Sequence, residues 1–105
     1  MPSQDYKADI LLETYRNNVV VFSKTYCPHA DDTKKLLVQN GIPYKVYELD
    51  KMSEGRQIQT NLKQMTGQWT VPSIWFCGNF IGGDAEFQRI GADKIKEMSY
   101  CINRK

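Results

Sequence analysis

The sequence predicts a single α/β domain, built on a four-stranded mixed sheet with helices on both faces. Short β-branched or apolar runs alternate with longer segments of helical periodicity. An early strand–helix–strand order predicts a parallel pair with a right-handed crossover, and Gly78-Asn79 between two short apolar runs predicts an antiparallel hairpin. The 105 residues suffice for one compact domain, spanning residues 1–105, and are too few for two.

The N-terminal part is expected to form a helix and then a buried strand. Residues 3–17 show helical spacing of apolar positions, with Ser3 as a capping residue, and Asn17-Asn18 ends the pattern. Residues 19–23 are rich in valine, which favours a strand. The loop that contains Cys27 therefore follows the first strand.

A second helix is expected directly after that loop. Pro28 suits the first helical position, and the pattern runs to about Asn40, with Gly41 as the C-terminal cap. Residues 44–49 alternate in polarity and are expected to form the second strand. The remaining expected elements are a helix at 53–66, a strand at 73–77, a strand at 80–81, a short helix at 84–90 and a last helix at 92–103, with Ile95, Met98 and Ile102 as its apolar stripe.

Composition excludes several classes of protein. A net charge of +2 without any basic run argues against nucleic acid as the main partner. Apolar stretches of no more than five residues are too short to span a membrane. The first residues lack a charged-then-apolar signal pattern, so the expected location is the cytoplasm.

The three cysteines, Cys27, Cys77 and Cys101, are widely spaced and odd in number. This pattern resembles neither a disulfide framework nor a zinc site, and a single histidine excludes a His-rich metal site, so no metal is expected. Cys77 falls in an apolar strand, where a buried thiol is expected. Cys101 falls late in the last helix and is expected to be a peripheral thiol.

Cys27 stands where a strand gives way to a helix. The helix N-terminus offers the amides of His29 and Ala30 to the sulfur, and Lys24 lies three residues earlier. Such surroundings lower a cysteine pKa from about 8.5 into the range of roughly 3.5–7.5, so we expect a thiolate at neutral pH. The alternative is a packed core thiol. His29 is open to two interpretations, a general base or an exposed residue lining a groove.

Two further motifs suggest a ligand groove. Val71-Pro72 precedes a strand, and a cis peptide bond there would present the Val71 backbone to an extended peptide; an ordinary trans turn is the alternative. Gly82-Gly83-Asp84 lets a ligand approach the backbone and opens a helix whose amides can meet a carboxylate. A plain loop before a helix is the alternative there.

Together these segments resemble the glutaredoxin family. The resemblance covers nearly the whole chain, with the motifs in the family's order and spacing. It implies a thioredoxin-like fold and a glutathione-dependent thiol–disulfide oxidoreductase. The matching segments are Lys24-Thr25-Tyr26-Cys27-Pro28-His29, Thr66-Gly67-Gln68-Trp69-Thr70-Val71-Pro72-Ser73 and Gly78-Asn79-Phe80-Ile81-Gly82-Gly83-Asp84.

The resemblance also implies a set of site residues. Cys27 would be the nucleophile that takes glutathione from a mixed disulfide, and a second glutathione would regenerate it. Glutathione would be a co-substrate, held along one groove. Its glycine carboxylate would meet Lys24 and Gln59, and its cysteine backbone would pair with Val71 beside cis-Pro72. Its γ-glutamyl end would meet Gly83, Asp84 and Ala85. His29 would line the groove.

Two positions depart from the family's dithiol pattern. Ala30 stands where a resolving cysteine is usual, so an intramolecular disulfide with Cys27 is impossible and the monothiol reaction with glutathione is expected. Trp69 stands where arginine is frequent. It leaves two outcomes open, a weaker affinity for glutathione or a groove rim turned toward protein partners.

The expected partners are glutathione and glutathionylated proteins or small mixed disulfides, acted on by a monomer. An iron–sulfur cluster-binding dimer is one alternative, with two Cys27 thiolates and two glutathiones as ligands. Family members of that kind carry Cys-Gly-Phe-Ser and an extra loop, which this chain lacks. A non-catalytic glutathione-binding module is the other alternative.

Overall fold

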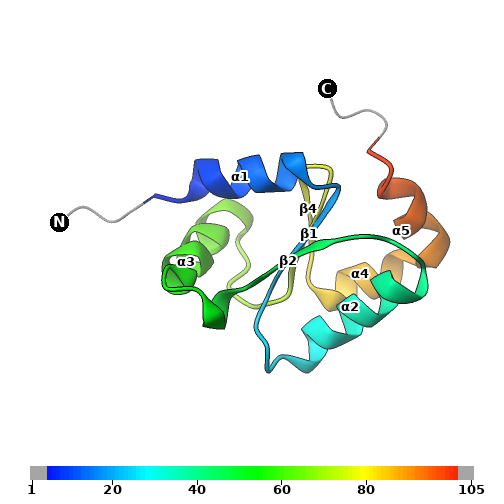
Figure 1. Ribbon diagram of the computed structural model, residues 1–105, viewed down its shortest axis with the longest axis horizontal. Helices are drawn as coiled ribbons and strands as arrows, with labels where there is room; N and C mark the ends of the chain where they lie inside the picture. The colour runs from blue at the N-terminus through cyan, green and yellow to red at the C-terminus, as the bar shows by residue number, and fades with distance from the viewer. Residues whose placement is uncertain (1–4, 102–105) are drawn as a thin grey trace.

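A computed structural model describes residues 5–101 of the chain (Figure 1). Helices and strands alternate much as the sequence predicts. The elements are α1 (Lys7–Arg16), β1 (Val19–Ser23), α2 (Pro28–Gln39), β2 (Lys45–Glu48), the short 3-10 helix η1 (Leu49–Lys51), α3 (Gly55–Thr66), β3 (Ser73–Phe76), β4 (Asn79–Gly82), α4 (Asp84–Ile90) and α5 (Ala92–Met98).

The four strands form one mixed sheet in the order β2-β1-β3-β4, which confirms the predicted fold class. β1 and β2 are parallel, and Val21 pairs with Val46. β3 runs antiparallel to both β1 and β4, with Val21 opposite Ile74 in the first of these pairs. β1 therefore lies inside the sheet and is buried along its whole length.

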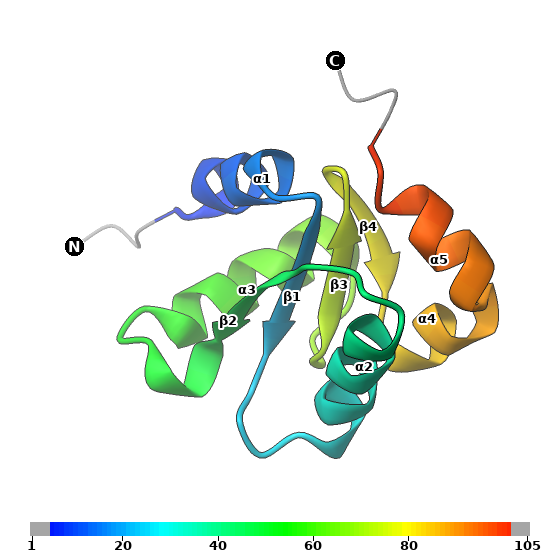
Figure 2. The same cartoon turned by 45° about the vertical axis from the view of Figure 1, so that its right-hand side comes forward.

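Helices cover both faces of the sheet, as Figure 2 shows, with α1 and α3 on one side and α2, α4 and α5 on the other. Successive side chains of a strand point to opposite faces. Val19 and Val21 accordingly pack with residues of α2, α4 and α5, while Val20 and Phe22 pack with residues of α1 and α3. The continuous apolar run in β1 thus serves two cores at once.

Polar contacts fasten β2, the strand at the edge of the sheet, to two helices. The Tyr47 hydroxyl donates to the Glu13 carboxylate of α1. Burial, reinforced by this bond, raises the pKa of Tyr47 to about 12, and the same bond lowers the pKa of Glu13. On the other side, Lys34 of α2 pairs with Glu48 at 2.6 Å.

The first helix begins later than the sequence predicts. It starts at Lys7, and the predicted cap Ser3 lies outside the described residues. The Asp5 carboxylate accepts the Lys7 N–H at 2.9 Å, and the Tyr6 N–H donates to Asn61 Oδ1 of α3 at 2.6 Å. These bonds satisfy N–H groups at the helix start, which a helix cannot satisfy by itself.

The third strand and the last helix are both shorter than predicted. β3 ends at Phe76, and Cys77 follows with a φ of 55°. α5 ends at Met98, and Cys101 adopts a φ of 54°. The chain therefore turns away before residue 103, and the predicted stripe residue Ile102 lies outside the described residues.

The short helix η1, which the sequence patterns did not predict, packs tightly on the start of α3. A Cβ atom at Gly55 would lie 1.9 Å from the carbonyl oxygen of Leu49. A glycine is therefore required for this approach of two backbone segments. η1 in turn carries Asp50, which bears on the candidate site.

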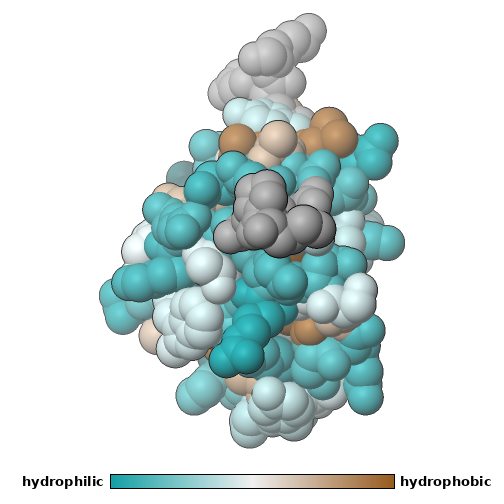
Figure 3. Space-filling view, turned by 90° about the vertical axis from the view of Figure 1, so that its left-hand side faces the viewer, coloured by the Kyte–Doolittle hydropathy of each residue, from teal (hydrophilic) through white to brown (hydrophobic). Residues whose placement is uncertain are grey.

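The surface in view in Figure 3, on the side of the molecule at the left of Figure 1, carries mainly hydrophilic side chains with small separate apolar patches outside the grey residues. Within residues 5–101, no helix combines the length and the apolar character needed to cross a bilayer.

Candidate functional site: a free thiol at the start of α2

Cys27 is the residue that precedes α2, and Pro28 occupies the first position of the helix. The Cys27 N–H donates to the Lys24 carbonyl at 3.1 Å, and its own carbonyl accepts the Asp31 N–H at 3.1 Å. The loop between β1 and α2 is thus closed by one turn, and it leaves Cys27 half-buried.

The Cys27 thiol does not meet the amides of α2 as the sequence suggested. Its side chain makes no capping bond, and the S–H donates instead to the Val71 carbonyl, with 3.6 Å between sulfur and oxygen. A thiolate has no proton to give to a carbonyl. Deprotonation would therefore abolish this bond and leave the sulfur free to approach a partner.

The predicted cis peptide bond between Val71 and Pro72 is confirmed. Gln68, which the sequence analysis did not single out, supports this segment. Its Nε2 donates to the Thr70 carbonyl at 2.9 Å and to the Pro72 carbonyl at 3.1 Å. The side chain of Gln68 thereby holds the backbone on both sides of Val71, and so fixes the carbonyl that the Cys27 thiol meets.

The start of α4 forms another wall beside α2. The Gly83 N–H already donates to Glu86 Oε1 at 2.7 Å, so this predicted ligand donor is occupied within the loop. The Asp84 carboxylate accepts the Thr33 hydroxyl of α2 at 2.7 Å. As the first residues of α4, Asp84 and Ala85 retain N–H groups without a partner inside the helix.

His29 lies beside carboxylates. His29, Asp32 and Asp84 each offer one donor atom, and these atoms lie within 4.8 Å of one another, the one such group found among residues 5–101. His29 and Asp32 are exposed, and Asp84 is half-buried. His29 is therefore a surface residue beside two carboxylates, and its role in the groove stays a prediction.

A hollow of about 420 Å³ is lined in part by residues of the Cys27 loop. Lys24 and Gln59, which the sequence analysis placed at one ligand carboxylate, both line it. The buried Gln59 side chain donates to the Trp69 carbonyl at 2.8 Å and so positions the Trp69 loop. Tyr26 and Trp69 also line the hollow and are 71% and 48% exposed.

Arg56, at the start of α3, is a further cation of this hollow that the sequence analysis missed. It lies 32 positions from Lys24 in the chain (56 − 24), and no local pattern connects the two. The fold nevertheless places both on one cavity with the Trp69 loop. A ligand carboxylate there would meet two positive charges.

Asp50 of η1 holds the Cys27 loop in place. Its carboxylate accepts both the backbone N–H of Thr25, at 2.9 Å, and the Thr25 hydroxyl. The hydroxyl bond is the largest cause that lowers the pKa of Asp50. The exposed carboxylate is therefore a positioning group for the loop that carries the thiol.

The three cysteines do not remain separate, contrary to the sequence-based expectation. Cys77 and Cys101 form a disulfide, and neither is the free buried or peripheral thiol that was expected. Their pairing depends on where β3 and α5 end. Cys27 is the free cysteine of the described residues, and Ala30, at the fourth position of its motif, is completely buried.

The comparisons with known proteins decide the family. The glutaredoxin family model matches residues 19–81, which include the β1–α2 thiol loop and the cis-proline segment. The chain belongs to the glutaredoxin family. Its four-stranded sheet and flanking helices are those of the family's solved structures.

Several relatives show how far the similarity of this glutaredoxin extends. A glutaredoxin of Ricinus communis is 58% identical over 67 residues, which cover 64% of this chain and 66% of the relative. Glutaredoxin-C1 of Arabidopsis thaliana is 55% identical over 65 residues, 62% of this chain and 52% of the relative. The matched part thus spans between half and two thirds of these curated relatives.

Among solved structures, a complex of buckwheat glutaredoxin with glutathione superposes with a TM-score of 0.85 at 39% identity. The superposition covers 89% of this chain and 86% of the buckwheat chain. Glutaredoxins as a class are thiol–disulfide oxidoreductases.

Proposed function

We propose that this glutaredoxin is a glutathione-dependent oxidoreductase that works with a single active-site thiol. The observation that carries the proposal is the Cys27 side chain, a half-buried free thiol beside the Val71 backbone at the start of α2. Ala30 puts a buried methyl group where a second sulfur would be needed for a dithiol reaction. Glutathione must then supply the second thiol.

The walls of the site match the chemistry of glutathione. We infer that the hollow with Lys24 and Arg56 takes the glycine carboxylate, while Val71 pairs with the backbone of the central cysteine. The N–H groups of Asp84 and Ala85 are available for the γ-glutamyl end. The complex of the buckwheat relative with glutathione supports this choice of ligand.

The reaction needs two exchanges of sulfur partners. The Cys27 thiolate attacks the glutathione sulfur of a mixed disulfide, and the substrate leaves as a thiolate that takes up a proton. The thiolate of a second glutathione then attacks the glutathione sulfur bound to Cys27. Glutathione disulfide leaves, and Cys27 is regenerated as a thiolate.

The test is the rate at which the reduced protein removes glutathione from a glutathionylated peptide. Cys27→Ser should lower that rate by on the order of 10³-fold, because serine is a poor nucleophile at neutral pH. The double variant Cys77→Ser/Cys101→Ser is the matched control and should keep the parental rate.

Two results would contradict the proposal. A parent protein that binds glutathione without turnover would be a binding module. A coloured dimer with a cluster, formed on anaerobic reconstitution with iron and sulfide and inactive toward the peptide, would be a cluster-binding protein.

A further inference from the structure

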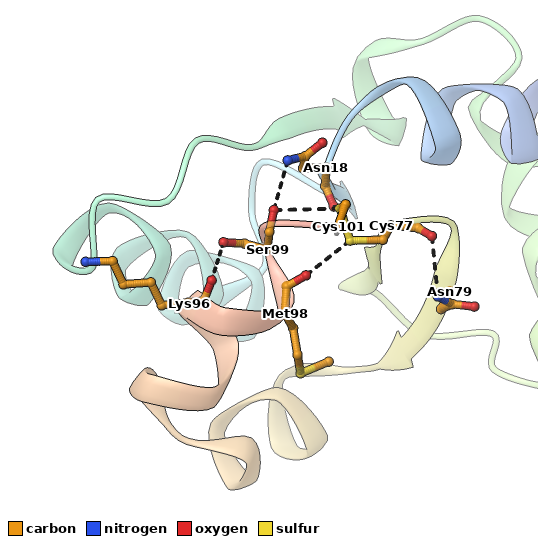
Figure 4. The surroundings of a disulfide bond; sticks show 7 residues. All are labelled: Asn18, Cys77, Asn79, Lys96, Met98, Ser99 and Cys101. Atoms are coloured by element: carbon orange, nitrogen blue, oxygen red, sulfur yellow. Dashed lines mark hydrogen bonds between the residues drawn. A yellow bond between two sulfur atoms is a disulfide. The ribbon is translucent and has the colours of Figure 1, made fainter. Parts of the chain in front are cut away.

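Three distant segments meet at the end of the sheet away from Cys27 (Figure 4). They are Asn18 before β1, Cys77 after β3, and the chain that follows α5. Cys77 and Cys101 are bonded here, with their Cα atoms 5.3 Å apart and a sequence separation of 24.

Hydrogen bonds that do not involve sulfur hold the same three segments together. The Asn18 carbonyl accepts the Cys77 N–H at 2.8 Å. The Asn18 side chain donates to the Ser99 carbonyl at 2.9 Å. One asparagine thus joins both cysteine-bearing segments, so the two sulfurs would stay close after reduction.

Each sulfur also has a backbone carbonyl within reach. Cys77 Sγ lies 3.1 Å from the Met98 oxygen, and Cys101 Sγ lies 3.7 Å from the Ser99 oxygen and 3.8 Å from the Asn18 oxygen. In a dithiol these oxygens can accept the S–H groups. Both cysteines are partly exposed, so a small thiol can reach them.

We propose that Cys77 and Cys101 form a second thiol–disulfide site, which opens and closes by exchange with glutathione and glutathione disulfide. In the reduced (open) form, backbone carbonyls can accept the S–H groups of the two cysteines. In the oxidised (closed) form, the two sulfurs are bonded to each other. Like the proposed function, this site reacts with glutathione, but it does not involve Cys27.

The closing reaction balances in two steps. The thiolate of one cysteine, whose proton has gone to solvent, attacks glutathione disulfide, forming a mixed disulfide and releasing a glutathione thiolate. The thiolate of the other cysteine, deprotonated likewise, then attacks the protein sulfur of that mixed disulfide and releases a second glutathione thiolate. The two released thiolates take up two protons, and in the whole reaction two electrons pass from the two cysteines to glutathione disulfide.

The closed bond encloses β4, α4 and α5. A cross-link over a segment of this length restricts the unfolded chain and so favours the folded state. For a domain of this size we expect the closed form to melt on the order of 10 °C above the open form. The stability of the protein would then report the glutathione redox balance.

The experiment uses Cys27→Ser, so that no exchange can pass through the active-site thiol. The variant is equilibrated at a series of ratios of glutathione to glutathione disulfide, quenched with acid and alkylated. Mass spectrometry then measures the disulfide-linked peptides, and thermal melting follows each sample. Cys27→Ser/Cys101→Ser is the matched control, which has no second sulfur to close the bond.

The proposal expects one reversible transition from dithiol to disulfide, with a rise in melting temperature that the control lacks. It would be overturned by free thiols at every ratio, by mixed disulfides with glutathione that never close, or by a bond that glutathione cannot reopen. Equal melting temperatures of the two forms would overturn the stabilising role. Because Cys27 is absent throughout, none of these outcomes bears on the peptide assay of the proposed function.

Discussion

The two ends of the β3–β4 hairpin handle sulfur in different ways. Near the start of β3 and the end of β4, Cys27 meets the Val71 carbonyl and has no second sulfur at the fourth position of its motif. At the hairpin turn, Cys77 meets the Met98 carbonyl and is bonded to Cys101. A backbone carbonyl lies near the sulfur at both ends, so the two ends differ mainly in whether a second sulfur is close by. Cys77 can form a disulfide within the chain, whereas Cys27 would need a sulfur from another molecule.

Charge also differs between the two ends. Lys24 and Arg56 line the hollow beside the Cys27 loop. Of the residues drawn around the disulfide in Figure 4, Asn18 and Asn79 are neutral, and Lys96 extends away from the sulfurs. Glutathione carries a net negative charge, so the two cations of the hollow favour its approach to the Cys27 loop. Exchange at Cys27 should accordingly be the faster of the two.

Ala30→Cys would place a second sulfur near Cys27 and so remove the main difference between the two ends of the hairpin. We expect a disulfide with Cys27 and a gain of about tenfold in the reduction of protein disulfides, because an intramolecular thiol competes well with free glutathione. Ala30→Ser, of similar size and without sulfur, is the control. Equal rates for the two variants in a protein-disulfide reduction assay would show that the fourth position does not set the mechanism.

Removing the charge of the hollow should weaken glutathione binding without slowing the chemical step. Lys24→Ala should raise the KM for glutathione about tenfold, equivalent to about 1.4 kcal/mol, and Arg56→Ala about threefold. Lys51→Ala changes an exposed lysine that does not line the hollow and is the control. A fall in kcat at unchanged KM would contradict the assigned role.

Asp50→Asn should have the smallest effect, visible mainly in the pH dependence of stability. The bonds from Thr25 hold the pKa of Asp50 below its unfolded value of about 3.9, so their stabilisation is complete above that pH. It is lost as the pH falls through the lower pKa of the folded state. The melting temperatures of parent and variant should therefore converge below about pH 4, and a constant difference would contradict this account.

Local patterns predicted most of the fold. The valine run marked β1, Pro28 marked the start of α2, and the glycines at 82 and 83 marked the start of α4. Each of these signals acts within a few residues of the chain. The local residues left the bond before Pro72 open between cis and trans, and the resemblance to the glutaredoxin family implied the cis form that the structure shows.

The missed features depend on contacts between distant segments. Arg56 and Asp50 reach the site from separate elements, and nothing in their immediate neighbours indicates it. The disulfide was missed for the same reason: Cys77 and Cys101 meet because both of their segments lie against Asn18. Sequence spacing alone cannot show such a meeting.

Gly55 shows that a position can tolerate no change and yet take no part in chemistry. Its missing side chain lets the Leu49 carbonyl lie against α3, and the turn that holds that carbonyl continues into Asp50. Any larger residue would push this turn outward and weaken the hydrogen bonds between Asp50 and Thr25. Variation among related sequences at position 55 should thus be as restricted as at the thiol itself, for reasons of space alone.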